Sequence, residues 1–157
     1  MMRKISSLKY SKMISIDSEA SIDDAINLMN KQEVNLLLVT EAGKGIGVLT
    51  SGAVFSQFYL HAGVHYPIIR FHGANELEDL NAQKLEIYKD RLNDFKKVKV
   101  SEVYSPRVRS VKLSQDVCDA VHMMKSLNLR RLVVADAEGN PIGVIDRQQV
   151  LHAAFNP

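Results

Sequence analysis

Three of the five histidines in this 157-residue chain fall in one short segment, as His61, His65 and His72. His61 and His65 are four residues apart, and on a continuous helix that spacing would turn both imidazoles toward one metal ion. Gly63 between them and Pro67 after them oppose such a helix, and no cysteine or carboxylate stands close in sequence to complete a ligand set. Metal binding is therefore a minority hypothesis, and we assign no metal ligand.

The chain lacks the motifs that covalent catalysis or phosphate hydrolysis would need. It has no glycine-rich phosphate loop, no paired-cysteine motif and no nucleophile on a sharp turn, since segment 47–51 reads as a strand ending. The single cysteine, Cys118, cannot form an internal disulfide, and its place in a helical pattern favours packing over redox chemistry. We infer that the protein is not an enzyme.

Composition and charge restrict the partners. Hydrophobic residues make up 46% of the chain and charged residues 24%, which is ordinary for a globular protein. A net charge of +2 falls short of the dense Lys/Arg clusters of nucleic-acid-binding proteins, so we expect no nucleic-acid partner. No apolar run approaches the roughly 20 residues that cross a bilayer, and segment 1–9 lacks a secretory-signal stretch. The sequence predicts a cytoplasmic protein without a membrane partner.

An internal repeat supplies the elements that must position any site. A pattern that begins near Ile5 returns about 95 residues later, near Val100. In each copy, apolar residues at helical spacing predict an amphipathic helix, and they are Ile22, Ala25, Ile26 and Met29 in the first copy and Val117, Ala120, Val121 and Met124 in the second. Ser21 and Asp116 are the predicted N-caps of these helices.

Short apolar runs between turn signals predict a strand hairpin in each copy, at 36–39 with 46–49 and at 132–135 with 142–145. Helical spacing then resumes at 53–60 and at 148–155. Each copy therefore reads strand, helix, strand, strand, helix. A unit of about 55 residues is marginal alone, so we expect the two copies to pack together.

This order of elements, stated twice, resembles the CBS (cystathionine-β-synthase) domain pair, or Bateman module. Its most specific pieces are the helix stripes, the apolar strands that end in Glu41 and Asp136, and the glycine-led strands at 47–50 and 143–146. The resemblance implies an α+β fold in which each copy is β-α-β-β-α and two small sheets pack in a pseudo-two-fold arrangement. It divides the chain into a first CBS repeat (1–60), an inserted loop and helix (61–99) and a second CBS repeat (100–157).

The resemblance also implies a function. CBS pairs are typically non-catalytic regulatory modules that bind an adenine nucleotide or a related adenosine compound in the cleft between the repeats. It suggests AMP, ADP, ATP or S-adenosylmethionine as the regulatory ligand, no required cofactor, a homodimer, and an unidentified protein partner that receives the signal. A ligand-free dimerisation or protein-interaction scaffold is the alternative, and a metal-responsive variant that uses the three histidines is the third hypothesis.

In the family, the strand-to-helix junction often reads glycine, two apolar residues, Thr or Ser, two variable residues, then Asp. Thr50 matches the hydroxyl position, with Ser51 beside it, and both suit a phosphate at a helix N-terminus. Ala53 stands where the family has its ribose-binding carboxylate. In the second copy the two positions are Asp146 and Gln149, and an ionised Asp146 would repel a phosphate. We therefore expect one site at most.

Arg130 and Arg131 form a guanidinium pair in the second copy alone, and the resemblance places them near ligand phosphates. Solvation of one arginine and pairing of the other with a neighbouring acid is an equally good interpretation. The predicted ligand-binding residues are Thr50, Ser51, Arg130, Arg131 and Asp146, with the anion among the first four.

The connection between the copies is longer than the usual CBS linker, and long structureless loops are uncommon in compact domains. Segment 76–97 predicts a helix with an imperfect apolar stripe made of Leu77, Leu80, Leu85, Tyr88, Leu92 and Phe95. We expect this helix to pack on the module, or on a second subunit.

Overall fold

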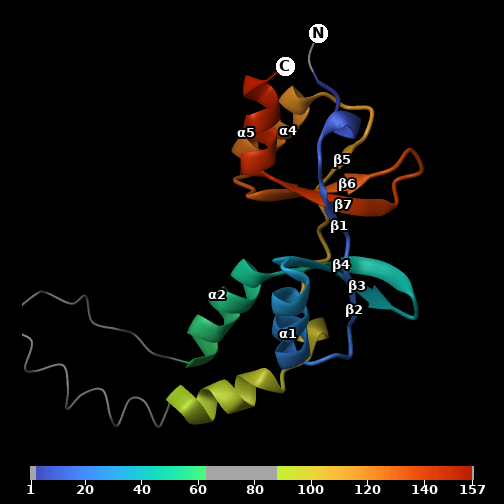
Figure 1. Cartoon of the computed structure of the whole chain (residues 1–157). Helices are drawn as coiled ribbons and strands as arrows, with labels where there is room; N and C mark the ends of the chain where they lie inside the picture. The colour runs from blue at the N-terminus through green and yellow to red at the C-terminus, as the bar shows by residue number, and fades with distance from the viewer. Residues whose placement is uncertain (1–2, 63–87, 157) are drawn as a thin grey trace, which may run out of the picture. The chain divides into compact units, whose positions relative to one another are not determined.

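The computed structural model of the chain describes residues 3–62 and 88–156. Two compact units are found (Figure 1). One is Ile16–Tyr104, called here the N-repeat unit; the other joins Met1–Ser15 to Ser105–Pro157 and is called the C-repeat unit.

The N-repeat unit is built on a three-stranded sheet of order β2-β3-β4. Its elements in chain order are β2 (Ser15–Asp17), α1 (Ile22–Gln32), β3 (Leu36–Glu41), β4 (Lys44–Thr50), α2 (Ser51–Ala62), a helix over 88–96, and the short 3-10 helix η3 (Val100–Glu102). Strands β3 and β4 form the predicted antiparallel hairpin. Figure 1 shows α1 and α2 on the same face of this sheet. The apolar side chains between helices and sheet are buried, which makes this face the core of the unit.

The C-repeat unit repeats this plan on a four-stranded sheet of order β1-β7-β6-β5. Its elements are η1 (Ile5–Ser7), β1 (Ser11–Lys12), β5 (Ser110–Lys112), α4 (Val117–Ser126), β6 (Arg131–Ala135), β7 (Pro141–Asp146) and α5 (Arg147–Phe155). Strand β5 is parallel to β6, whereas β6 and β7 form the predicted antiparallel hairpin. The predicted α+β fold, with strand, helix, strand, strand, helix in each copy, is confirmed.

The segment that begins each sequence copy packs in the compact unit formed mostly by the other copy. In the C-repeat unit, the Ile5 amide donates to the Gln115 carbonyl at 2.9 Å, and Ile5 is fully buried. In the N-repeat unit, the Val100 amide donates to the Ala20 carbonyl at 2.8 Å, and Val100 is equally buried. The compact units are therefore interleaved along the chain. The division into 1–60, 61–99 and 100–157 describes the repeated sequence and stays a prediction.

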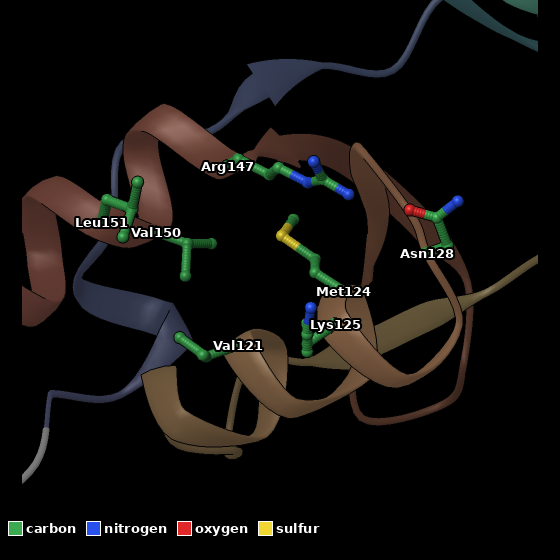
Figure 2. Close-up of a pocket in the computed structure, with 7 residues that line it drawn as sticks. All are labelled: Val121, Met124, Lys125, Asn128, Arg147, Val150 and Leu151. Carbon is green, nitrogen blue, oxygen red and sulfur yellow. The ribbon is translucent and has the colours of Figure 1, made fainter.

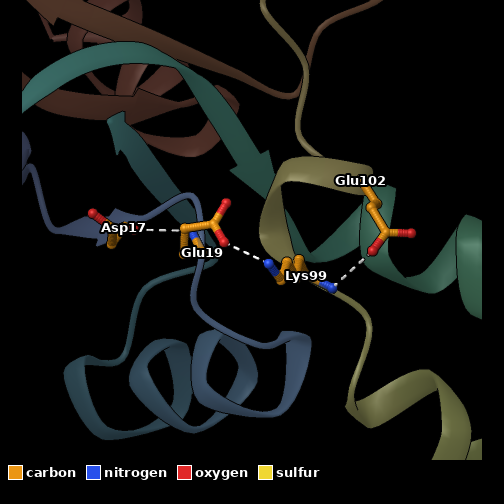
Figure 3. A network of polar contacts seen from close by, with 4 residues as sticks. All are labelled: Asp17, Glu19, Lys99 and Glu102. Carbon is orange, nitrogen blue, oxygen red and sulfur yellow. Dashed lines mark hydrogen bonds and ion pairs between the residues drawn. The ribbon is translucent and has the colours of Figure 1, made fainter. Parts of the chain in front are cut away.

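Polar contacts join the start of η3 to the segment after β2 within the N-repeat unit (Figure 3). The Lys99 ammonium forms an ion pair with Glu19, and this contact raises the pKa of Lys99 above its ordinary value. The Glu19 amide donates to an Asp17 carboxylate oxygen at 2.9 Å, and the Lys99 amide donates to Glu102 at 3.4 Å. Exposed ion pairs contribute little stability, so the network mainly orients the segment.

The two central helices begin as the sequence predicts, with different caps. Ser21 Oγ accepts from the Asp24 amide at 3.0 Å, and the Asp24 carboxylate accepts from the Ser21 amide at 3.1 Å. The Ser21 hydroxyl, which donates to the Asp24 carboxylate at 2.8 Å, and the Ser21 amide together lower the pKa of Asp24 below its ordinary value. In the second copy the Asp119 carboxylate accepts from the Asp116 amide at 3.0 Å, while the Asp116 carboxylate pairs with Lys4 at 3.0 Å.

Candidate functional site

In the N-repeat unit, the predicted residues Thr50 and Ser51 lie where β4 passes into α2. The half-buried Thr50 Oγ1 accepts a hydrogen bond from the Ala53 amide at 3.1 Å, so it caps the helix. The Ser51 amide donates to the Asn35 carbonyl at 3.0 Å, which joins the helix start to the residue before β3. The Thr50 hydroxyl proton remains available as a donor, and the helix N-terminus beside it favours an anion.

In the C-repeat unit, Asp146 occupies the same junction between β7 and α5 and is also a helix cap. Its Oδ1 accepts from the Gln149 amide at 2.8 Å, and its own amide donates to Gln149 Oε1 at 2.9 Å. Gln149 Nε2 then donates to the Lys9 carbonyl at 2.9 Å, which ties the segment before β1 to α5. The side-chain amide of Gln149 is therefore hydrogen-bonded to the backbone through both its oxygen and its nitrogen. The role of Asp146 as a ligand contact stays a prediction.

Arg131 is the first residue of β6 and lies opposite Asp146 in the β6–β7 register. Its side chain is half-buried, and burial lowers the pKa of the guanidinium; Asp146 acts in the opposite direction and Arg130 adds to the lowering. No carboxylate oxygen of the described residues forms an ion pair with Arg131 within 4.0 Å. Arg130 is exposed, and its carbonyl accepts from the Arg147 amide at 3.3 Å. Arg131 is thus a partly desolvated cation that faces Asp146 across the hairpin but forms no ion pair within 4.0 Å among the described residues.

The five predicted ligand contacts divide between the units. Thr50 and Ser51 belong to the N-repeat unit, whereas Arg130, Arg131 and Asp146 belong to the C-repeat unit. Within each unit the structure brings the predicted residues to the end of the hairpin, where the second helix starts. That they form one site remains a prediction.

Sequence reasoning missed a cavity of about 270 Å³ in the C-repeat unit (Figure 2). It lies between α4 and α5 and is lined by Val121, Met124, Lys125, Asn128, Arg147, Val150 and Leu151. A signal for it was present in the repeat, because Lys125 and Arg147 have Asn30 and Ser51 as their counterparts in the first copy. Isolated polar differences between repeats usually lie on a solvated surface, so this pair alone does not predict a cavity.

The predicted helix at 76–97 is confirmed over 88–96; residues 76–87 lie outside the described residues. As expected, this helix packs on the module. The centroid of the Phe58 ring lies 5.3 Å from that of Tyr88 and 5.4 Å from that of Phe95. Phe95 is buried, and a cavity of about 250 Å³ remains between this helix, α1 and α2.

Of the three clustered histidines, only His61 can be placed. Its ring lies 5.5 Å from the Phe95 ring, whereas His65 and His72 lie outside the described residues. Within 3–62 and 88–156, no group of three or more His, Cys, Asp or Glu side chains is arranged to hold a metal ion. The same stretches contain no helix with the length and apolar character needed to span a bilayer.

Comparison with protein families gives one match in each copy. The family model described as CBS domain matches residues 5–59 and 100–156, which is most of the chain. Among curated proteins, the uncharacterized protein MJ1426 of Methanocaldococcus jannaschii is 26% identical over 144 residues, covering 90% of this chain and 86% of that protein. MJ1404 of the same organism is 21% identical over 98% of this chain; the match covers 29% of MJ1404, so this chain spans under a third of its length.

Solved structures share the fold. The CBS domain NE2398 aligns with a TM-score of 0.69 at 19% identity, over 99% of both chains. CBSX2 from Arabidopsis thaliana aligns with a TM-score of 0.67 at 19% identity, over 99% of this chain and 96% of that one. A structure of CBSX2 in complex with AMP aligns with a TM-score of 0.63 at 22% identity, over 98% and 96% of the two chains.

Proposed function

Since this chain belongs to the CBS-domain family, we propose that it is a non-catalytic regulatory module that binds an adenine nucleotide or related adenosine compound and signals to a protein partner. The AMP bound by CBSX2, a structural relative, supports an adenine nucleotide as the ligand. The ligand contacts proposed are Thr50, Ser51, Arg130, Arg131 and Asp146. The cytoplasmic location expected from the sequence stays a prediction.

The observation that carries this proposal is the half-buried Arg131. Charged side chains are rarely removed from water without a partner, because desolvation of an unpaired charge costs free energy. Arg131 is desolvated in part, lies opposite Asp146 in the hairpin, and has no ion-pair partner within 4.0 Å among the described residues. A phosphate would supply a negative charge in direct contact, and a guanidinium can bind it through two parallel hydrogen bonds.

The start of α2 supports the same ligand chemistry. Thr50 uses its oxygen as an acceptor for the helix, so its proton can be donated to a phosphate oxygen. Asp146, at the equivalent place in the second copy, offers only acceptor oxygens when ionised, which suits a ribose hydroxyl and opposes a phosphate. The two junctions are therefore chemically different, in accord with one ligand orientation and not two equivalent sites.

Isothermal titration calorimetry with AMP, ADP, ATP and S-adenosylmethionine tests the proposal. We expect saturable binding of at least one ligand, and a loss of about tenfold or more in affinity for Arg131→Gln, because a charge-assisted contact is removed. Arg107→Gln is the control, since Arg107 is exposed in the same unit. The absence of binding heat for all four ligands at millimolar concentration would contradict the proposal, and equal affinities of the two variants would remove Arg131 from the site.

A ligand-free dimerisation scaffold is the second candidate, and the outer face of α2 favours it. Phe55 and Tyr59, one turn apart on the same face of α2, are 73% and 50% exposed, and Leu60 farther round the helix is 69% exposed. Clustered exposed apolar surface often marks an interface. A second copy of this chain is the partner we propose for that face.

Light scattering measures this directly. We expect the wild-type chain to be a dimer and Phe55→Glu to be a monomer at the same concentration, since a carboxylate would have to be desolvated in the interface. Gln57→Glu is the matched control, because Gln57 is exposed on the same helix. A Phe55→Glu variant with wild-type mass would exclude this face as the dimer contact.

A further inference from the structure

The cavity between α4 and α5 in the C-repeat unit has no role in the function proposed above. We propose that it is a separate binding site for a small organic anion with an apolar body, such as an aromatic carboxylate. Its lining is mostly apolar with a few polar groups, the composition typical of ligand sites. Its volume of about 270 Å³ suits a small ligand.

Apolar side chains from both helices form the walls. Met124 and Val150 are buried, with exposed fractions of 4% and 2%. Val121 and Leu151 are 41% and 49% exposed. The two exposed side chains keep apolar surface in water that a ligand would cover. Burial of that surface would stabilise a bound hydrophobic group.

The polar side of the cavity is cationic. Arg147 Nε donates to the Leu129 carbonyl at 2.9 Å, which holds the guanidinium in place and leaves its terminal N–H groups for a ligand. In Figure 2 the Arg147 side chain extends from the start of α5 toward the end of α4, where Lys125 and Asn128 lie. The Lys125 ammonium has no hydrogen-bond or ion-pair partner within the part of the chain described, and no carboxylate lines the cavity. Two positive charges and an amide therefore select an anion.

Comparison of the two copies distinguishes cavity residues that the repeated fold requires from cavity residues that it does not require. The apolar positions of the cavity are apolar in both copies: Val121, Met124, Val150 and Leu151 correspond to Ile26, Met29, Val54 and Phe55. The polar positions differ, because Lys125, Asn128 and Arg147 correspond to Asn30, Glu33 and Ser51. Asn128 and Glu33 have positive φ values of 51° and 53°, so the backbone is the same where the side chains diverge. The cationic rim is thus not required by the fold, which supports a role in binding.

Phenylacetate, with phenylethanol as its neutral counterpart, is the probe pair for this site. We expect methyl-resolved NMR of the full chain to show saturable shifts at Val121, Met124, Val150 and Leu151. Phenylacetate should bind about tenfold more tightly than phenylethanol, because only the carboxylate gains charge-assisted hydrogen bonds. Lys125→Gln and Arg147→Gln should each reduce the affinity for phenylacetate severalfold and leave that for phenylethanol unchanged.

Lys9→Gln, in the same unit but outside the cavity, is the control and should bind both probes as the wild type does. Equal affinity for the two probes, or wild-type phenylacetate affinity in Lys125→Gln, would overturn the proposal. Loss of the shifts as protein concentration rises would identify a second copy as the occupant and overturn it too. Saturating AMP should leave the phenylacetate shifts unchanged. Competition between AMP and phenylacetate would show that the cavity is not a separate site and would overturn the proposal.

Discussion

Substitution of Gly143 by alanine is expected to detach β1 from β7 and to lower the free energy of unfolding by about 2 kcal/mol. A Cβ atom at this position would lie 2.2 Å from Tyr10 Cδ2 and 2.7 Å from the Ser11 carbonyl oxygen. The tyrosine ring could turn aside, but the carbonyl belongs to the backbone of β1, which pairs with β7 at Val144 and Gly143. The strand itself must therefore move.

Urea denaturation measures the loss, and amide hydrogen exchange at β1 and β7 locates it. Gly52→Ala is the matched control, because a Cβ there has Thr50 Oγ1 at 3.9 Å as its nearest neighbour and the position lies in α2. We expect no loss for the control, and a gain of up to about 1 kcal/mol from helix propensity. Wild-type stability and exchange in Gly143→Ala would refute the close contact between β1 and β7.

Leu132→Ala is expected to cost about 3 kcal/mol of unfolding free energy, within the range for large-to-small changes in a packed core. Leu132 is fully buried and lies opposite Ile145 in the hairpin. Its counterpart in the first copy, Leu37, is equally buried and lies opposite Leu49, so Leu37→Ala should have a similar cost. Both substitutions remove the same group from the same place in the repeated fold.

Urea denaturation of the two variants beside Leu127→Ala provides the comparison. Leu127 is 43% exposed, so its truncation should cost under about 1 kcal/mol. If Leu132→Ala were no more destabilising than Leu127→Ala, the position of Leu132 in the core would be wrong.

Most of the fold could be predicted because its determinants are local. Buried positions recur at helical spacing in α1, where Ile22, Ala25 and Met29 are all buried, and the hairpins follow from short apolar runs between turns. The same apolar stripe includes Ile26, which is not in the core: it is 40% exposed, and its counterpart Val121 is 41% exposed. An apolar arc on a helix shows which side is hydrophobic, but its edge can border solvent or a cavity.

The exchange of first segments could not be predicted, because it depends on non-local pairing. Nothing in the pattern around Ile5 indicates that its amide will bond to Gln115, more than a hundred residues away in sequence. The same limit applies to Gln149, which appears as a lost ribose contact in the sequence and holds the Lys9 carbonyl in the structure. Thr50, in contrast, lies at the helix start where its motif predicts it.

Backbone NMR during a titration with AMP tests whether an adenine nucleotide contacts the residues proposed for it, Thr50 and Ser51 in one unit and Arg131 in the other. We expect the amides of Thr50, Ser51 and Arg131 to shift during the titration and to reach saturation. Arg131→Gln should weaken the binding of AMP. Absence of saturable shifts at these residues up to millimolar AMP, or shifts confined to the cavity between α4 and α5, would contradict the proposed contacts.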